Sequence, residues 1–398
     1  MNDRAGRERL LEGLPPNVFR LGLVSFFADV SSEMLYPLIP IFLTTVLGAP
    51  VAAVGLIEGL AEGTASILKS VSGWWSDRVR RRKPLVFGGY ALSAVAKPLL
   101  AIAGGWPFAL FARVVDRVGK GIRGAPRDSL LADSIEPEYR GKAFGWHRGM
   151  DSLGAVVGPL LALALLAALH GDIRAVLLLA FVPGVAGAAL VLFVKDRGRA
   201  ARTVDRPSLR LLPRQFRAYL LVWGLFALTN SSDVFLILRA QSLGFSTVAV
   251  VVAYALYNLV YSLASPVLGG LSDRVGRRRV LRVGLVVFAA VYVGFAFARQ
   301  AWLVWPLFAV YGFYIAATDG VGKALAVDLV PASVRGTAIG VFGTVSGVAA
   351  VVASVVAGLL WDRIGPFAPF VYGAVGALIA AGLLALVRTS PHPVAAGE

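Results

Sequence analysis

Long apolar segments, separated by short polar stretches, run through almost the whole chain. A helix needs roughly 20 apolar residues to cross the hydrocarbon core of a bilayer, and by this measure the pattern predicts about twelve spans. The predicted spans lie near residues 17–44, 51–75, 84–104, 107–132, 142–168, 174–194, 217–239, 247–270, 280–298, 301–327, 336–360 and 365–388. The pattern therefore predicts an all-α membrane protein.

A short basic turn occurs twice, as SDRVRRRK at 76–83 and as SDRVGRRR at 272–279. Farther along each half, Asp133 and Arg140 match Asp328 and Arg335 in nearly the same register. A repeat of this length built from apolar spans is typical of secondary transporters. We therefore predict two pseudo-symmetric six-helix bundles joined by a linker. The predicted parts are an N-terminal tail at 1–16, a first bundle at 17–194, a basic linker at 195–216, a second bundle at 217–388 and a tail at 389–398.

Composition supports a membrane location and excludes several other classes. Of 398 residues, 57% are hydrophobic and 16% charged, with a mean hydropathy of +0.74, far from the mix of a soluble globular protein. The net charge of +16 is concentrated in alternate loops, which is the positive-inside pattern rather than a nucleic-acid surface. An even number of spans then places both termini in the cytoplasm and the chain in the cytoplasmic (inner) membrane.

The sequence lacks the patterns of a cleavable signal peptide, a disulfide framework and the common enzyme motifs. The polar residues 1–16 lack the apolar core of a cleavable signal, so we expect the first span to remain in the mature protein. The chain has no Cys and only three His and three Met, which excludes a disulfide framework and leaves few soft metal ligands. We expect no cofactor and no metal. No glycine-rich phosphate loop, nucleophile elbow or zinc-spaced histidine pair occurs, so we do not expect an enzyme.

The two basic turns carry a family resemblance. The sequence resembles the loop signature of the major facilitator superfamily between helices 2 and 3 and between helices 8 and 9. The second copy matches throughout, whereas the first has Arg80 where Gly is usual and bulky Trp74 and Trp75. The resemblance implies a gating role for these residues: Gly73, Asp77, Arg78, Arg81, Arg140, Gly269, Asp273, Arg274, Arg277 and Arg335.

The loop aspartates are expected to stabilise the form that is closed on the cytoplasmic side. A carboxylate is favoured at a helix N-terminus by about 0.3–1 kcal/mol. We therefore predict that Asp77 meets the start of helix 11, at Arg335, and that Asp273 meets the start of helix 5, at Arg140. The alternative is that these loops only set the membrane topology.

Ionisable side chains inside predicted spans indicate a cavity or a proton path, because they are costly in lipid unless paired or hydrated. The helix 4 spacing of Arg117, Lys120 and Gly121 is similar to the Arg-x-x-Gln-Gly motif of proton-coupled family members. We predict that Arg117 is a switchable partner of titrating carboxylates, because a neighbouring cation changes their proton occupancy. A fixed salt-bridge network is the alternative. The candidate coupling residues are Asp29, Glu33, Glu58, Glu62, Arg113, Asp116, Arg117 and Asp151.

Helix 5 contains Gly154, Gly158 and Pro159, which resemble the motif of exporters in the family. The downstream glycines of that motif are replaced by residues such as Ala162 and Leu163. Small residues at this spacing also serve close helix packing. Export is therefore one implication, and plain packing is the other.

The second half is chemically different, because aromatic and amide groups replace most of the charges. Such groups suit an amphiphilic or aromatic cargo through stacking and cation contacts, although core aromatics are the alternative explanation. The candidate substrate-binding residues are Tyr36, Lys97, Asn230, Asp233, Tyr254, Tyr257, Asn258, Tyr261, Tyr311, Tyr314 and Asp319.

Together these features predict a monomeric secondary transporter whose partners are a small organic solute, protons and the lipid bilayer. Proton-coupled export by alternating access is the first prediction. The alternatives are uptake or efflux of an anionic metabolite, which Lys97, Arg113, Arg117 and Arg123 favour, a cation exporter that uses carboxylates, and a membrane sensor on the same fold.

Overall fold

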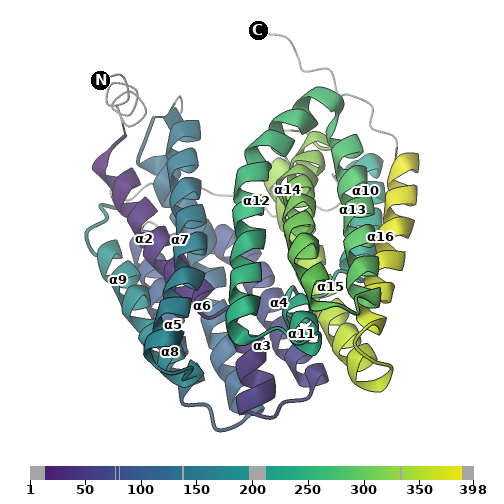
Figure 1. The fold of residues 1–398 in the computed structure, drawn as a ribbon. Helices are drawn as coiled ribbons and strands as arrows, with labels where there is room; N and C mark the ends of the chain where they lie inside the picture. The colour runs from purple at the N-terminus through teal and green to yellow at the C-terminus, as the bar shows by residue number, and fades with distance from the viewer. Residues whose placement is uncertain are drawn as a thin grey trace, which may run out of the picture.

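A computed structural model describes residues 14–76, 78–79, 81–136, 139–196, 212–331 and 334–387, and all regular structure in this part of the chain is helical. Two groups of helices lie side by side, one from each half of the chain (Figure 1). This arrangement confirms the predicted all-α membrane fold of two pseudo-symmetric bundles. Among the described helices, nine are long and apolar enough to cross a membrane.

The first bundle contains six spans, of which the first is divided into α2, α3 and η1 and the sixth into α8 and α9. Its elements are α2 (Pro16–Glu33), α3 (Ile39–Ile41), the π-helical turn η1 (Phe42–Val46), α4 (Val51–Ser76), α5 (Lys83–Ala101), α6 (Trp106–Asp133), α7 (Arg140–Ala168), α8 (Ile173–Leu179) and α9 (Phe181–Val191). Helix α6 is long enough to cross a membrane, but it is not among these nine because it carries the charged stripe described above.

The second bundle repeats this course. Its elements are α10 (Arg214–Ala227), α11 (Val234–Ser242), α12 (Thr247–Val275), α13 (Arg277–Phe297), the 3₁₀ turn η4 (Ala301–Leu303), α14 (Val304–Asp328), α15 (Arg335–Arg363) and α16 (Ala368–Leu386).

The first and seventh predicted spans are broken, which the apolar pattern did not predict. Helix α2 ends at Glu33, and a turn that contains Pro37 separates it from α3. Helix α10 ends at Ala227, and α11 begins after Asp233. Proline and short polar side chains favour such interruptions because they remove or replace backbone hydrogen bonds. Each break places an acidic residue, Glu33 or Asp233, beside irregular backbone at the same position of the repeat.

The bundles meet along α4 and α15 and along α7 and α12. Helices α4 and α15 approach so closely that a Cβ atom on Gly55 would lie 2.2 Å from the backbone carbonyl oxygen of Ser354. We call the end that carries residues 76–83 and 272–279 the basic end, and the end that carries Val51 and Asp362 the opposite end. At the opposite end, the N–H of Ala52 donates to Asp362 Oδ2 at 2.8 Å, joining the two bundles.

Candidate functional site

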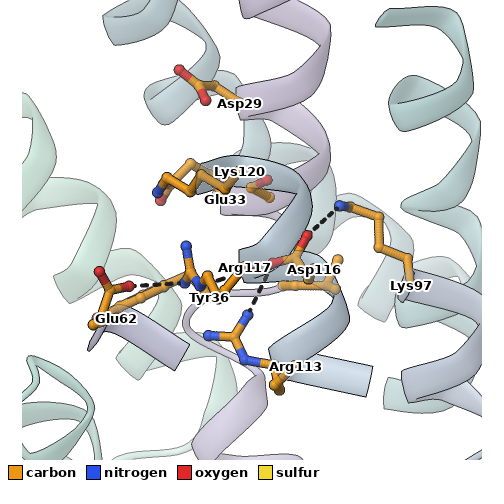
Figure 2. Close-up of a pocket in the computed structure, with 11 residues that line it drawn as sticks. Asp29, Glu33, Tyr36, Glu62, Lys97, Arg113, Asp116, Arg117 and Lys120 are labelled. Atoms are coloured by element: carbon orange, nitrogen blue, oxygen red, sulfur yellow. Dashed lines mark hydrogen bonds and ion pairs between the residues drawn. The ribbon is translucent and has the colours of Figure 1, made fainter. Parts of the chain in front are cut away.

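A cavity of about 70 Å³ lies on the inner face of the first bundle, roughly midway along α6. Figure 2 shows its charged side chains, which come from α2, α4, α5 and α6. Its lining consists of Asp29, Ser32, Glu33, Leu35, Tyr36, Glu62, Lys97, Arg113, Asp116, Arg117 and Lys120. The structure therefore brings most of the predicted coupling residues to one place.

Two glycines of the predicted exporter motif hold the acidic face of α2 against α7. A Cβ atom on Gly154 would lie 2.9 Å from Asp29 Cβ, and one on Gly158 would lie 2.8 Å from Glu33 Cβ. These positions therefore require glycine for close packing of α7 on α2. This contact agrees with the packing interpretation of the motif and supplies no separate evidence for export.

Several of the predicted coupling residues form a fixed ionic network. Arg113 donates from Nε to Glu58 Oε1 at 2.9 Å and from Nη2 to Glu58 Oε2 at 2.8 Å, and the Glu58 side chain is fully buried. A two-pronged pair of this kind has strong geometric preference and is costly to break when buried. Glu58 and Arg113 are thus bound to each other across α4 and α6.

Arg117 and Asp116 belong to the same network. Arg117 Nη2 lies 3.1 Å from Glu62 Oε1, and only 4% of the Arg117 side chain is exposed. Asp116 faces three cations, with Lys97 Nζ at 3.4 Å, an Arg113 nitrogen at 3.5 Å and an Arg117 nitrogen at 3.9 Å. The structure thus pairs Arg117 with Glu62, one of the carboxylates for which we predict it to be a switchable partner, and the switching itself stays a prediction.

Three charged groups of the cavity lie outside this network. Within the described part of the chain, Asp29 and Lys120 form no hydrogen bond or ion pair, and Lys120 is exposed in the cavity. Glu33 accepts a hydrogen bond from the hydroxyl of Tyr254, in the second bundle, at 2.7 Å. Asp29 and Lys120 therefore have no ion pair to break before they change partners, and Glu33 has the hydrogen bond from Tyr254 to break.

Lys120 and Arg123 were not among the predicted site residues, although both line cavities. Their spacing along α6 continues the stripe of Arg113 and Arg117, so helical periodicity was the available signal. Arg123 lies with its guanidinium 4.3 Å from the centre of the Tyr90 ring and donates to Ser93 Oγ at 2.7 Å.

Asp151 is partly buried and does not line the cavity. His147 Nδ1 lies 3.6 Å from Asp151 Oδ2, and His147 Nε2 lies 2.7 Å from Ser25 Oγ. Arg127 also donates to Ser25 Oγ, at 2.9 Å. The other oxygen of Asp151 is buried without a hydrogen-bond partner.

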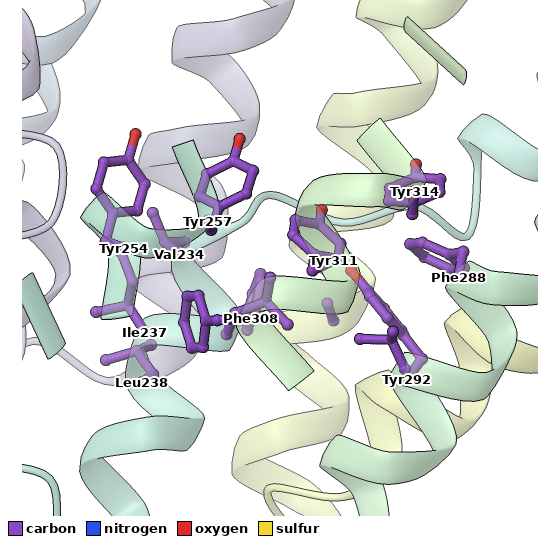
Figure 3. Close-up of a cluster of buried hydrophobic side chains, with 14 of the residues drawn as sticks. Val234, Ile237, Leu238, Tyr254, Tyr257, Phe288, Tyr292, Phe308, Tyr311 and Tyr314 are labelled. Atoms are coloured by element: carbon purple, nitrogen blue, oxygen red, sulfur yellow. The ribbon is translucent and has the colours of Figure 1, made fainter. Parts of the chain in front are cut away.

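The second bundle places Asp233 among tyrosines. Asp233 accepts hydrogen bonds from Tyr311 at 2.6 Å and from Tyr257 at 3.3 Å. The surrounding rings form a buried aromatic cluster (Figure 3), and Tyr254, Tyr257, Tyr311 and Tyr314 are not among the residues that line the cavity. Their role in substrate binding remains a prediction.

The remaining predicted substrate residues are dispersed. Asn230 donates to the Tyr314 hydroxyl at 3.2 Å, and Asn258 donates to the Tyr254 carbonyl at 3.2 Å. Tyr261 accepts a hydrogen bond from Arg148 at 2.7 Å, nearer the basic end, and Asp319 pairs there with Lys323 at 2.5 Å. Of the predicted set, only Tyr36 and Lys97 line the cavity.

The predicted gating contacts lie partly outside the described residues. Asp77 is not described, and neither is the Arg140 side chain. Asp273 is 64% exposed and accepts a hydrogen bond from Arg277 at 3.2 Å, while Arg277 also pairs with Asp328 at 2.8 Å. These are contacts within the second bundle, so the predicted contacts of Asp77 and Asp273 across the interface remain predictions.

The other gating candidates show no shared site. Arg78, Arg81 and Arg274 are exposed, Arg335 begins α15, and Gly269 has open space around it. A Cβ atom on Gly73 would lie 3.4 Å from Ala125 Cβ of α6. Sequence reasoning missed the contact of Asp362 with Ala52, although an aspartate that ends a long apolar segment was a signal for it.

Comparison with known proteins adds the evolutionary context. The family model of the major facilitator superfamily matches residues 21–252 and 218–398. The chain is 37% identical to an uncharacterized MFS-type transporter of Methanocaldococcus jannaschii over 381 residues, which cover 94% of this chain and 95% of that protein. It is 25% identical to the class G tetracycline resistance protein of Vibrio anguillarum, over 73% of this chain and 75% of that protein.

Solved structures show the same fold. A crystal structure of the nucleoside transporter NupG, 12% identical in sequence, superposes with a TM-score of 0.78 and covers 94% of this chain and all of that one. The family match spans both halves: its first part runs from α2 into α12 and its second part begins in α10, so the two parts overlap. The chain therefore belongs to the major facilitator superfamily of membrane transporters.

Proposed function

We propose that the protein exports a small organic solute across the cytoplasmic membrane in exchange for protons, with both termini in the cytoplasm and as a monomer. The observation that carries the proposal is the pair Asp29 and Glu33, two carboxylates without an ion pair in a cavity inside a membrane bundle. Ionisable groups in such a place mark substrate or proton paths.

The interface supports alternating access to this cavity. Glu33 is bonded to Tyr254 across the bundle interface, so its protonation state bears directly on a contact between the two moving parts. At the opposite end, Asp362 and Ala52 join the bundles. Loss of these contacts on one side and formation of others at the basic end would expose the cavity alternately, which is how repeats in such folds are expected to move.

Export is favoured by the relatives rather than by the cavity. Two tetracycline resistance proteins match this chain, class H at 32% identity over 124 residues and class G at 25% over 307 residues. Resistance by a membrane transporter implies outward movement, and we carry only this direction to the present chain.

Flux measured in proteoliposomes tests the proposal. A compound library is screened with a pH-sensitive dye trapped inside, so that exchange is detected as compound-dependent proton movement. We expect a hit whose flux depends on the pH gradient and falls at least about tenfold in Glu33→Gln, since this variant cannot release a proton. Flux that is indifferent both to the gradient and to Glu33→Gln would refute proton coupling.

A further inference from the structure

The net charge of the cavity depends on the ionisable side chains that do not belong to an ion pair. Arg113 pairs with Glu58, Arg117 pairs with Glu62, and Lys97 pairs with Asp116 at 3.4 Å. Opposite charges in contact largely cancel each other at a distance. These basic residues are therefore unavailable to an anionic cargo, although their number in the sequence favoured one.

The groups outside these ion pairs include more carboxylates than cations. Asp29 and Glu33 have no basic partner within ion-pair distance in the described structure, and Asp233, behind the tyrosines, has only hydroxyl partners. Against these three carboxylates stand Lys120 and Arg123. Arg123 donates to Ser93 and its guanidinium lies over the Tyr90 ring, so among the residues that line the cavity Lys120 is the cation without an ion pair in the described structure.

An aromatic wall completes the site. The ring of Tyr36 lines the cavity and stacks on Tyr254, with centroids 5.3 Å apart and an interplanar angle of 25°. Tyr254 in turn donates to Glu33. A carboxylate next to tyrosine rings is the combination that recognises organic cations, because the ring face and the carboxylate both attract positive charge.

We propose that the cargo is an organic cation, an amine or a quaternary ammonium compound, whose positive group binds Asp29 and Glu33 beside the Tyr36 ring. Lys120, which forms no ion pair in the described structure, competes with the cargo for this carboxylate pair. The proposal rests on the proposed transport function and names its substrate class. Cargo and protons then compete for the same carboxylates, which is the requirement for exchange of one for the other.

The groups that face the carboxylate pair come from four helices. Lys120, Arg117 and Arg123 face it from α6, Glu62 from α4, Asp151 from α7, and Tyr254 from α12. Among the basic groups, Arg117 and Arg123 have other partners in the structure, so Lys120 is the one with the freedom to move. Its flexible four-carbon stem suits that role better than a planar guanidinium would.

The sign of the cavity potential can be measured without knowing the cargo. The chain contains no cysteine, so Ser32→Cys places a single thiol in the cavity lining next to Glu33. We compare how fast two reagents modify this thiol: the cationic ethyltrimethylammonium methanethiosulfonate and the anionic ethylsulfonate methanethiosulfonate. Each rate is divided by the rate of the same reagent with a small free thiol. We expect the cationic reagent to be favoured at least about tenfold at pH 8, and less as the pH falls and the carboxylates gain protons.

Charge variants in the Ser32→Cys background locate the source of this preference. Glu33→Gln and Asp29→Asn should each reduce the preference for the cationic reagent severalfold, and Lys120→Gln should increase this preference severalfold. Lys83→Gln makes the same charge change outside the cavity, where Lys83 donates to the Leu192 carbonyl, and should leave the preference unchanged.

Three results would overturn the proposal. They are faster modification by the anionic reagent, a preference that does not respond to Lys120→Gln, and failure of both reagents to reach the thiol, since a cargo site must be accessible. The assay involves no transport. A strong cationic preference without any proton-coupled flux would therefore count against the transport proposal alone, and flux with an anionic preference would count against the cargo class alone.

Discussion

The two bundles follow the same helical course but have opposite interiors. The first is held together by ion pairs such as Arg113 with Glu58, whereas the second is filled by aromatic contacts such as that of Phe288 with Tyr292, whose centroids lie 3.8 Å apart. Both retain an acid at the break of their first helix, Glu33 and Asp233. Glu33 faces a cavity with free charges, and Asp233 is enclosed by tyrosine hydroxyls. The repeat thus preserved backbone and acid while the surroundings diverged.

The largest effect is expected from breaking the ionic core of the first bundle. Glu58→Gln leaves Arg113 buried without its counter-charge and should lower the free energy of unfolding by about 3–5 kcal/mol. Unfolding of the purified protein in mixed micelles by a denaturing detergent measures this. The double variant Glu58→Met with Arg113→Met removes both charges and should recover most of the loss. A loss under about 1 kcal/mol in Glu58→Gln would show that the pair is not essential to this bundle.

A substitution in the contact between α4 and α15, which we call the seam between the bundles, should have the next largest effect. Gly55→Ala places a Cβ atom 2.2 Å from the Ser354 carbonyl oxygen, so the close approach of α4 and α15 becomes unfavourable by about 1–3 kcal/mol. With a reporter thiol at Val351→Cys, labelling by a membrane-impermeant maleimide should become faster. Gly343→Ala is the control. Gly343 lies on α15, the helix that carries Val351, and its Cβ would lie 3.8 Å from the nearest atom, Ser70 Oγ of α4. Equal labelling of both variants would argue against a tight seam.

The tyrosine enclosure of Asp233 predicts an effect of similar size that is more selective. Tyr311→Phe removes the hydroxyl that donates to Asp233 and should cost about 1.5–3 kcal/mol of unfolding free energy, as for hydrogen bonds to charged groups. The Tyr292 hydroxyl is buried without a hydrogen-bond partner, so Tyr292→Phe should be neutral or slightly stabilising. The same detergent unfolding assay applies. If the two variants lose equal stability, ring packing alone holds this bundle together.

The smallest effect is expected at the opposite end of the seam. Asp362→Asn removes the charge at the start of α4 and should weaken the contact between bundles by about 0.3–1 kcal/mol, or roughly twofold to fivefold in the population open at that end. Labelling of Val351→Cys reports the change. Asp172→Asn alters a similar cap on Ala175 inside the first bundle and should have no effect on labelling. An unchanged rate in Asp362→Asn would mean that the contact plays no part in opening.

Apolar length, charge position and the repeat were sufficient to predict the helices and most of the charged cavity. Asp29, Glu33, Glu62 and Arg117 converge as helical periodicity indicated. The partner of each charge was not predictable, because α6 presents Arg113, Arg117 and Lys120 on neighbouring turns, and each reaches several carboxylates in principle. Arg117, the predicted switchable partner of the carboxylates, pairs with Glu62. Lys120, which the sequence placed in the motif but not among the coupling residues, forms no ion pair in the described residues.

The sequence by itself determined a duplicated membrane protein with charges buried in its first half, because hydrophobic length and the cost of charge in lipid act on each segment separately. Only the tertiary structure decided which charges cancel, where the first and seventh spans break, and that Glu33 reaches Tyr254 in the other bundle. Those outcomes depend on distances of a few ångströms between helices far apart in the chain. Coulomb and hydrogen-bond energies change steeply over such distances, so no local pattern encodes them.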